Sequence, residues 1–566
     1  MFIRNCATFG TLNLYYANIT FTQKFFPNMS NPFLTPRRAM VLECLLIVGL
    51  ALVPLFATFP YRVNIFLSWE GAYRLSEGQV PYKDFGLPLG YGYWLVPALF
   101  FKLFGPQLIS LVKAQILLNI VGGLSFRYIL QQMRVSPGVR LLSVLVFVLS
   151  YSFVNFWPWY NNTVIIYQLV GLAFLFRGLG EGRWKWPALF FAGAFTFLSF
   201  FTKQDGGGLA LLLALALLGY HSLNARRWQE LAGFIGSYVL VALIFIIPAM
   251  PGFGYWFNHG QPPHSSRLSV MDFIDVLLIE SQWLKFYFAV IVILLLPELR
   301  KPRELWRNRS LMLFLLLTVG ILTEAALFQV TSYTPPDNNI FFHGFAVAFI
   351  LFRIYDLTTV RFEDLKPFLA AAVVIMLWWS ASYYKYIARI LYQLNPPAAA
   401  VVVPGGENVV NRHNFMVNLD TTDVPTSEWT FSSLPEFSKV YMPPSTVAGI
   451  DRVMALPEAK KGKDAKVLNL TELTPLDHAI GYTLETGADI PLWHHLGVGM
   501  FNRQMAAYTE KIRNRHYDLV LYEHAPTLNN FFGSALRDEL KQHYRQIDSF
   551  HAPRRPTNAY IEVFVR

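Results

Sequence analysis

The chain has 566 residues, of which 54% are hydrophobic and only 15% are charged, and its mean hydropathy is +0.36. A soluble protein of this length needs more charge to cover its surface, so the composition predicts an integral membrane protein. The formal net charge is +11. Most of the excess falls in short segments between apolar runs, and no basic helix or aromatic-basic platform accompanies it, so we do not expect nucleic acid as a partner.

Residues 1–39 precede the first apolar run and are expected to form an N-terminal cytoplasmic tail. Residues 1–28 lack the pattern of a signal peptide. Met29 offers a more usual beginning, with Arg37 and Arg38 just before the apolar run, and we expect translation to start there. The two cysteines, Cys6 and Cys44, define neither a disulfide framework nor a metal site.

The segment 40–384 holds about eleven apolar runs near the length that a helix needs to cross the hydrocarbon layer. Many of the 14 Trp and 28 Tyr residues sit at the ends of these runs, as in an interfacial belt. We therefore predict an α-helical polytopic membrane domain. The predicted spans are 40–59, 108–130, 141–157, 163–179, 186–201, 207–223, 231–250, 284–296, 311–330, 340–355 and 368–384.

The distribution of cations tests this count, because cytoplasmic loops carry an excess of Lys and Arg. With the N-terminus inside, each loop predicted to be cytoplasmic carries at least two Arg or Lys residues, whereas the opposite loops 156–162 and 331–339 have no cation. The expected topology is an inner (plasma) membrane protein with a cytoplasmic N-terminus and an extracytoplasmic C-terminus. The basic positions are Arg37, Arg38, Arg134, Arg140, Arg183, Lys185, Arg226, Arg227, Arg300, Lys301, Arg303, Arg307, Arg309, Arg361 and Lys366.

The first external loop, 60–107, is too long for a plain connector. It begins with a polar stretch and continues with 88–105, an apolar and aromatic run that Pro97 and Lys102 interrupt. We expect this run to form a helix along the interface. Counting it as a span would invert every later loop and destroy the charge pattern.

From residue 385 onward the hydrophobic runs become short and charges frequent, which predicts an extracytoplasmic α/β domain over 385–566. The segment 398–463 is rich in Pro and Gly and is interpreted as a long linker or extended structure. Expected strands are 467–470, 518–522 and 561–566, and expected helices are 500–513 and 531–543.

The polar residues favour an enzyme over a transporter. Transporters tend to carry ionisable groups near the bilayer midplane, whereas the predicted spans are nearly free of them, Glu324 being the exception. Carboxylates and cations gather instead in the outward loops, where they suit activation of a hydroxyl and binding of a phosphate. These loop residues are Glu70, Arg74, Glu77, Lys83, Asp84, Lys203, Asp205, His259, His264, Arg267, Asp337 and His343.

Two motifs carry a resemblance to a known family. The first is Trp69-Glu-Gly-Ala-Tyr73, followed by Glu77-Gly-Gln-Val-Pro-Tyr-Lys-Asp-Phe85, Pro88 and the aromatic run ending at Gly105. The second is Leu198-Ser-Phe-Phe-Thr-Lys203 with glycines from Gly206 to Gly208. Together they resemble membrane glycosyltransferases of the C-type fold, close to the protein mannosyltransferase and aminoarabinose transferase group.

The resemblance implies a sugar donor linked to polyprenyl phosphate and an extracytoplasmic acceptor in the cell envelope, a lipid or a glycan. It implies that Glu70 and Asp84 are the catalytic carboxylates. Lys203 would face the donor phosphate, with Lys83 and Arg74 as weaker candidates, and Asp205 and His343 would contact substrate. The family commonly has an Asp before this Glu, and here that position is Trp69, which leaves open whether Glu70 or Asp84 is the base.

Several of these residues also have a simpler structural explanation. Glu70 could cap a turn, Asp84 could pair with Lys83 in a turn, and Lys203 could reach lipid headgroups. His259, His264 and Asp272 fit no standard ligand spacing, so we predict no metal site, although the sequence leaves a divalent cation open. The alternative functions are a transporter or flippase of a lipid-linked glycan, and a non-catalytic envelope scaffold.

Overall fold

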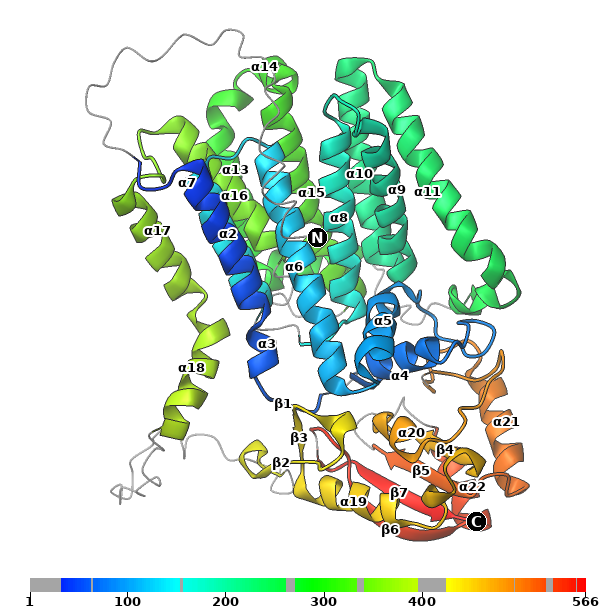
Figure 1. Cartoon of the computed structure of the whole chain (residues 1–566). Helices are drawn as coiled ribbons and strands as arrows, with labels where there is room; N and C mark the ends of the chain where they lie inside the picture. Colours follow the sequence, from blue (N-terminus) through cyan, green and yellow to red (C-terminus); the bar gives the residue numbers. More distant parts are fainter. Residues whose placement is uncertain are drawn as a thin grey trace.

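The computed structural model describes residues 32–62, 65–152, 156–260, 270–332, 341–394, 424–492, 494–525, 533–555 and 557–566. Met29, His264, Arg267 and Asp337 lie outside these residues. In Figure 1 a layer of long helices stands above a smaller C-terminal domain, and the short helices α4, Ile65–Ser76, and α5, Leu95–Phe104, lie between them.

The upper layer consists of apolar helices. Each of the eleven predicted spans lies largely within a helix or a consecutive pair of helices. Within the described residues, six helices are long and apolar enough to cross a membrane, or up to seven if the pair α17 and α18, bent by 70°, is one span. The helices are α2 Pro36–Ala51, α3 Val53–Phe56, α6 Leu108–Gln132, α7 Pro137–Ser152, α8 Tyr160–Gly178, α9 Lys185–Thr202, α10 Gln204–Ala225, α11 Trp228–Ala249, α12 Val270–Asp275, α13 Gln282–Leu299, α14 Pro302–Arg307, α15 Arg309–Ser332, α16 Phe341–Leu357, α17 Leu365–Trp378 and α18 Ser380–Leu394.

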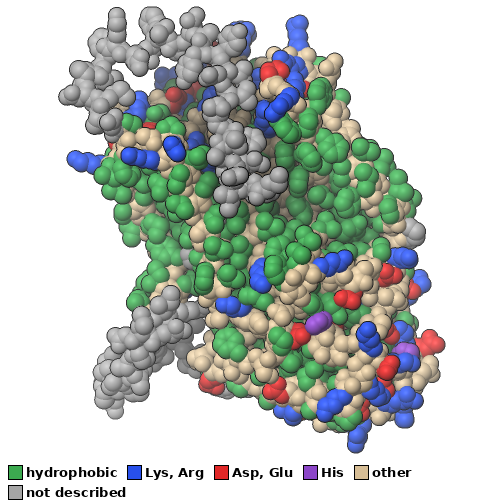
Figure 2. Space-filling view, viewed as in Figure 1, with side chains coloured by type: hydrophobic (Ala, Val, Ile, Leu, Met, Phe, Trp, Pro, Cys, Tyr) green, Lys and Arg blue, Asp and Glu red, His purple; other side chains and the backbone are tan. Residues whose placement is uncertain are grey.

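Large apolar side chains remain exposed along the outer helices. On α11, Leu240, Ile244 and Ile247 are 50–61% exposed, which suits contact with lipid rather than water. Figure 2 shows hydrophobic side chains covering this layer, while Lys, Arg, Asp and Glu gather on the C-terminal domain and at the opposite end. The protein is an α-helical polytopic membrane protein with a C-terminal α/β domain.

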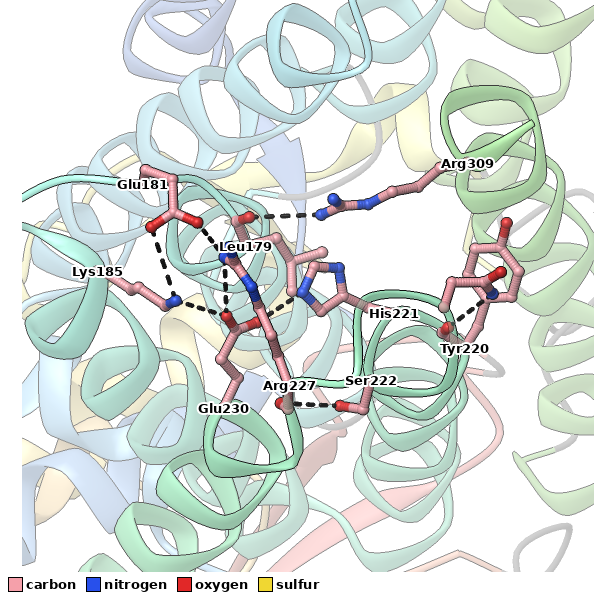
Figure 3. Close-up of polar contacts among 10 residues, drawn as sticks. Leu179, Glu181, Lys185, Tyr220, His221, Ser222, Arg227, Glu230 and Arg309 are labelled. Carbon is pink, nitrogen blue, oxygen red and sulfur yellow. Dashed lines mark hydrogen bonds and ion pairs between the residues drawn. The ribbon is translucent and has the colours of Figure 1, made fainter. Parts of the chain in front are cut away.

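The loops rich in cations contact one another at the end far from the C-terminal domain. The backbone of Leu34 donates to the Glu363 carbonyl, and the Gly138 backbone donates to the Glu363 side chain. A second group, drawn in Figure 3, joins α9, α10, α11 and α15 around the buried Glu230, whose carboxylate lies 2.6 Å from Lys185 Nζ and 2.7 Å from His221 Nε2. The loops predicted to be cytoplasmic therefore lie together at one end of the molecule. That this end faces the cytoplasm remains a prediction.

The loop after the first span, 60–107, contains two short helices, α4 Ile65–Ser76 and α5 Leu95–Phe104. The sequence predicted a helix in the second part of this loop, and α5 confirms it. The helix α4 was not expected, because the charged residues Glu70, Arg74 and Glu77 indicated a polar stretch. Its residues from Ile65 to Arg74 are all buried, because α5 and the C-terminal domain cover them.

The C-terminal domain has a four-stranded sheet in the order β4-β5-β7-β6. The strands β4 and β5 are parallel, and β7 is antiparallel to both of its neighbours. The predicted strands and helices of this domain match β4, β5, β7, α21 and α22 to within three residues at each end. The elements are β4 Val467–Leu470, α20 Pro475–Ile480, α21 Phe501–Arg513, β5 Leu519–His524, α22 Ser534–His543, β6 Arg545–His551 and β7 Tyr560–Val565.

A second, three-stranded sheet joins the two parts of the chain. The strand β1, Phe59–Pro60, follows the first span and pairs in parallel with β3, Val440–Met442, which also pairs with β2, Thr430–Phe431. With α19, Pro444–Ala455, these elements correct the linker interpretation of 398–463 for its described part, 424–463. Val440, Met442 and Ile450 are fully buried, so this stretch belongs to the packed domain.

One hydrophobic core continues across the junction. Trp69 and Leu111, from the helical layer, lie in the same buried cluster as Leu476, Leu519 and Val563 of the C-terminal domain. Because burial of apolar surface is the main stabilising term in protein association, the C-terminal domain is docked firmly on α4 and on the adjoining end of α6.

Candidate active site

Glu70 and Arg74 form a buried ion pair on α4. They are four residues apart on the helix, and Arg74 Nε lies 2.8 Å from Glu70 Oε1. Arg74 Nη1 also donates to Gln79 Oε1 and to the Glu485 carbonyl, both at 3.0 Å. The Arg74 guanidinium thus links the Glu70 carboxylate to the turn after α4 and to the C-terminal domain.

The Glu70 carboxylate lines a cavity of about 50 Å³ between α4 and the C-terminal domain. Residues around β4 and α20 form the opposite wall. Asp477 accepts hydrogen bonds there from Asn469 Nδ2 at 2.8 Å and from the Tyr482 hydroxyl at 2.6 Å. The other polar side chains at the wall are Thr471, Glu485, His494 and Tyr508.

Burial perturbs both carboxyl groups in this cavity. Burial raises the pKa of Glu70, and the neighbouring Arg74 guanidinium opposes that rise. Burial and, second, the charge of Glu70 raise the pKa of Asp477 to about 7. Two acidic groups with raised pKa values beside one guanidinium are a common arrangement at sites of proton transfer, although structural ion pairs also produce it.

Asp477, Tyr482 and Asn469 were absent from the sequence predictions. They lie about 400 positions after Glu70 in a domain with no recognised motif, and only the docking of the two parts brings them together. The predicted strand 467–470 was the one available signal, since polar residues that follow a strand often lie at a site.

Lys203 and Asp205 lie at a second place, the junction of α9 and α10. Lys203 Nζ is 2.8 Å from Asp205 Oδ2 and lies over the Phe328 ring, 4.4 Å from its centroid. Nearby on α15, the buried Glu324 accepts a hydrogen bond of 2.6 Å from Gln168 Nε2 on α8. Lys203 is itself 8% exposed, so its ammonium is a buried cation paired with the Asp205 carboxylate.

Asp84 and Lys83 lie in a turn of the first loop. Asp84 Oδ2 accepts a hydrogen bond of 2.7 Å from the Val80 backbone, and the Asp84 carbonyl accepts one from Gly487. Lys83 is exposed. Neither residue belongs to the wall of the Glu70 cavity, so their predicted catalytic and phosphate-binding roles remain predictions.

His343 lies apart from these groups, at the start of α16. Its Nδ1 is 2.7 Å from the Tyr287 hydroxyl on α13, and the rings of Trp283 and Trp379 pack edge-on against it. The structure therefore distributes the seven predicted site residues over four locations: Glu70 with Arg74, Asp84 with Lys83, Lys203 with Asp205, and His343.

No clustered set of His, Cys, Asp and Glu side chains suited to a metal ion occurs among the described residues. His259, Asp272 and His494 of the C-terminal domain thus form no such cluster within that part of the chain.

The fold and site define a polytopic membrane protein with a cavity lined by ionisable side chains at the junction with its α/β domain. No family model matches the sequence, and no curated protein matches it. Two solved structures of ArnT from Cupriavidus metallidurans are similar to it. The apo structure has a TM-score of 0.45 at 11% identity, covering 93% of this chain and 97% of that one. The structure bound to undecaprenyl phosphate has a TM-score of 0.44 at 11% identity, with the same coverage.

Proposed function

We propose that this protein is a membrane glycosyltransferase that moves a sugar from a polyprenyl-phosphate carrier to an extracytoplasmic acceptor of the cell envelope. The observation that carries the proposal is the buried Glu70 carboxylate, set by the first-loop motif in a cavity at the membrane boundary. Its raised pKa suits a general base, which works best when its pKa approaches the ambient pH.

The Lys203 site supplies the second chemical requirement, a cation for the phosphate of the donor. The Lys203 site lies close to α4. The Ser68 hydroxyl, two residues before Glu70, donates to the Pro158 carbonyl at 2.5 Å, and Lys203 Nζ lies 5.7 Å from the centroid of the Tyr160 ring. The segment 158–160 thus contacts Ser68 of α4 as well as Lys203, which supports a donor phosphate and an acceptor on neighbouring sides of it.

The cavity must enlarge before a sugar can enter. Ligand sites generally occupy about 300–1,000 Å³, whereas this cavity measures about 50 Å³. Residues 484–492 of the C-terminal domain form one wall, and the Ile490 carbonyl and Leu492 amide both pair with the backbone of Gly86. In the proposed reaction this segment moves away from α4 when substrate binds, and Arg74 releases the Glu485 carbonyl.

A non-catalytic envelope scaffold is the second candidate, favoured by a specific observation. Trp69 stands where the family commonly has Asp; it is fully buried against Tyr73 and Phe101. Glu70 is bound to Arg74. An acidic residue held by a salt bridge, with its usual partner replaced by a packed indole, also suits a purely structural helix.

The two candidates are separated by an assay of the purified full chain in nanodiscs with sugar-loaded polyprenyl phosphate and an envelope extract as acceptor. Glu70→Gln should abolish sugar transfer while leaving membrane insertion intact, and Lys203→Ala should raise the KM for the donor more than that for the acceptor. Glu510→Gln, at an exposed position of α21, is the matched control. Transfer that persists in Glu70→Gln removes the catalytic assignment, and absence of transfer in the wild type with every loaded donor favours the scaffold.

A further inference from the structure

A second and larger hollow lies on the other side of the domain junction, where the first span ends. It has a volume of about 410 Å³. One wall is the segment that begins with β1; the others are the segment before β2 and the connection between β6 and β7. The lining residues are Pro60, Tyr61, Arg62, Thr426, Trp429, Arg554 and Arg555; we call this hollow the arginine groove.

Arg554 forms the fixed part of the groove. It is 1% exposed, and its Nε and Nη2 lie 2.8 Å from Glu472 Oε2 and 2.6 Å from Glu523 Oε1. Its Nη1 has no hydrogen-bond partner in the described part of the chain. A buried guanidinium nitrogen without an acceptor costs free energy, so an anion at this position would relieve an existing deficit.

One of the two carboxylates beside Arg554 carries a reduced negative charge. Burial, followed by the charge of Glu523, raises the pKa of Glu472 to about 8, which reduces the negative charge that this carboxyl carries beside Arg554. Arg62 and Arg555 are both exposed. Among the described residues, the Arg62 guanidinium makes no ion pair or hydrogen bond, which leaves it able to meet a ligand.

The groove lies next to the membrane surface. Phe56, the last residue of α3, is 79% exposed, as expected for a side chain in contact with lipid. Arg62 follows six residues later, which an extended chain covers in at most about 20 Å. Phe431 of β2, in the same small sheet as Pro60, is 51% exposed, and exposed aromatic and Arg side chains together are typical of the headgroup region.

We infer that the arginine groove binds the phosphate of an anionic membrane lipid headgroup. Guanidinium groups bind phosphate oxygens in a bidentate geometry that ammonium groups lack. The volume of the groove, about 410 Å³, falls within the range of small-ligand sites. The groove and the Glu70 cavity have no lining residue in common, so the groove is a separate site from the one proposed for sugar transfer.

The test uses the full chain in phosphatidylcholine nanodiscs, titrated with short-chain phosphatidylglycerol. Arg62→Gln combined with Arg555→Gln should weaken phosphatidylglycerol binding about tenfold, while leaving the Arg554 ion pairs and the fold intact. Arg545→Gln, an exposed arginine on β6, is the control and should bind like wild type.

Three outcomes would overturn the inference. The double variant could bind phosphatidylglycerol as wild type does. Arg545→Gln could lose as much affinity as the double variant, which would make the effect one of net charge alone. Excess inorganic phosphate could bind to the groove by itself and displace the lipid completely, which would define a free-phosphate site instead.

Discussion

Arg74 and Glu70 stand one turn apart on α4, with Nε and Oε1 separated by 2.8 Å and both side chains buried. Removing one member of such a pair leaves a buried charge without its partner, which costs about 3–5 kcal/mol. Arg74→Gln should therefore lower the thermal unfolding temperature markedly, because Glu70 would then face Asp477 with no guanidinium nearby. Tryptophan fluorescence of the detergent-solubilised chain during heating measures the change.

Arg503→Gln is the matched control for Arg74→Gln. Arg503 Nη2 also lies 2.8 Å from a carboxylate, that of Asp489, but its side chain is 69% exposed. Exposed ion pairs contribute little to stability. Equal unfolding temperatures for the two variants would contradict a special role of the α4 pair.

Asp477 should make the stability depend on pH. Its pKa, ordinarily 3.8, is raised to about 7 in the folded protein, so the folded state binds the proton more tightly than the unfolded state. The stabilisation from this proton is fully present below pH 3.8 and is lost as the pH rises to about 7. The unfolding temperature should fall between pH 5 and pH 7 by more in the wild type than in Asp477→Asn.

Asp548→Asn separates this effect from the general pH response. Asp548 pairs with Arg452 at the domain surface, and the substitution also removes one carboxylate. Its pH profile should follow that of wild type. A profile of Asp477→Asn that is identical to wild type would show that the cavity does not perturb this group.

The elements of the C-terminal domain were predictable where a short apolar run is bounded by polar residues, as in β4 and β7. The helix α4 was not, because its burial comes from contacts with residues such as Leu476 that lie about 400 positions away. The same separation along the sequence kept Asp477 and Tyr482 from being predicted as site residues. By contrast, the sequence located the turn at Lys203 and Asp205, because it depends on local geometry between two apolar helices.

Glu230 joins the loops opposite the C-terminal domain, as Figure 3 shows. Its side chain is 2% exposed and lies within 2.7 Å of groups on both Lys185 and His221. Glu230→Gln should leave the Lys185 ammonium without its buried counter-charge and cost about 3–5 kcal/mol. Glu304→Gln, whose pair with Lys301 is largely exposed, should unfold at the wild-type temperature. If both variants unfold alike, the network contributes nothing to holding these helices together.

The glycines after Lys203 permit a close helix–helix turn. A Cβ atom at Gly207 would lie 2.1 Å from Phe200 Cα, in the backbone of α9. Gly207→Ala should therefore displace the start of α10 and destabilise the protein. Gly219, on the same helix, has nothing within 4 Å of its Cβ position, so Gly219→Ala should be neutral or stabilise by about 0.5–1 kcal/mol. Thermal unfolding of the two variants decides; a harmless Gly207→Ala would mean that the turn adapts easily.

The membrane orientation can be tested with single cysteines placed at the two ends of the molecule. After Cys6 and Cys44 are replaced by Ser, Lys301→Cys marks the basic loop before α14, and Lys460→Cys marks the exposed surface of the C-terminal domain. Cations are retained on the cytoplasmic side during insertion, so a membrane-impermeant maleimide should label residue 460 in right-side-out vesicles and residue 301 only in inside-out vesicles. The reverse pattern would place the α/β domain in the cytoplasm, where a donor or acceptor confined to the outer leaflet could not reach the Glu70 cavity.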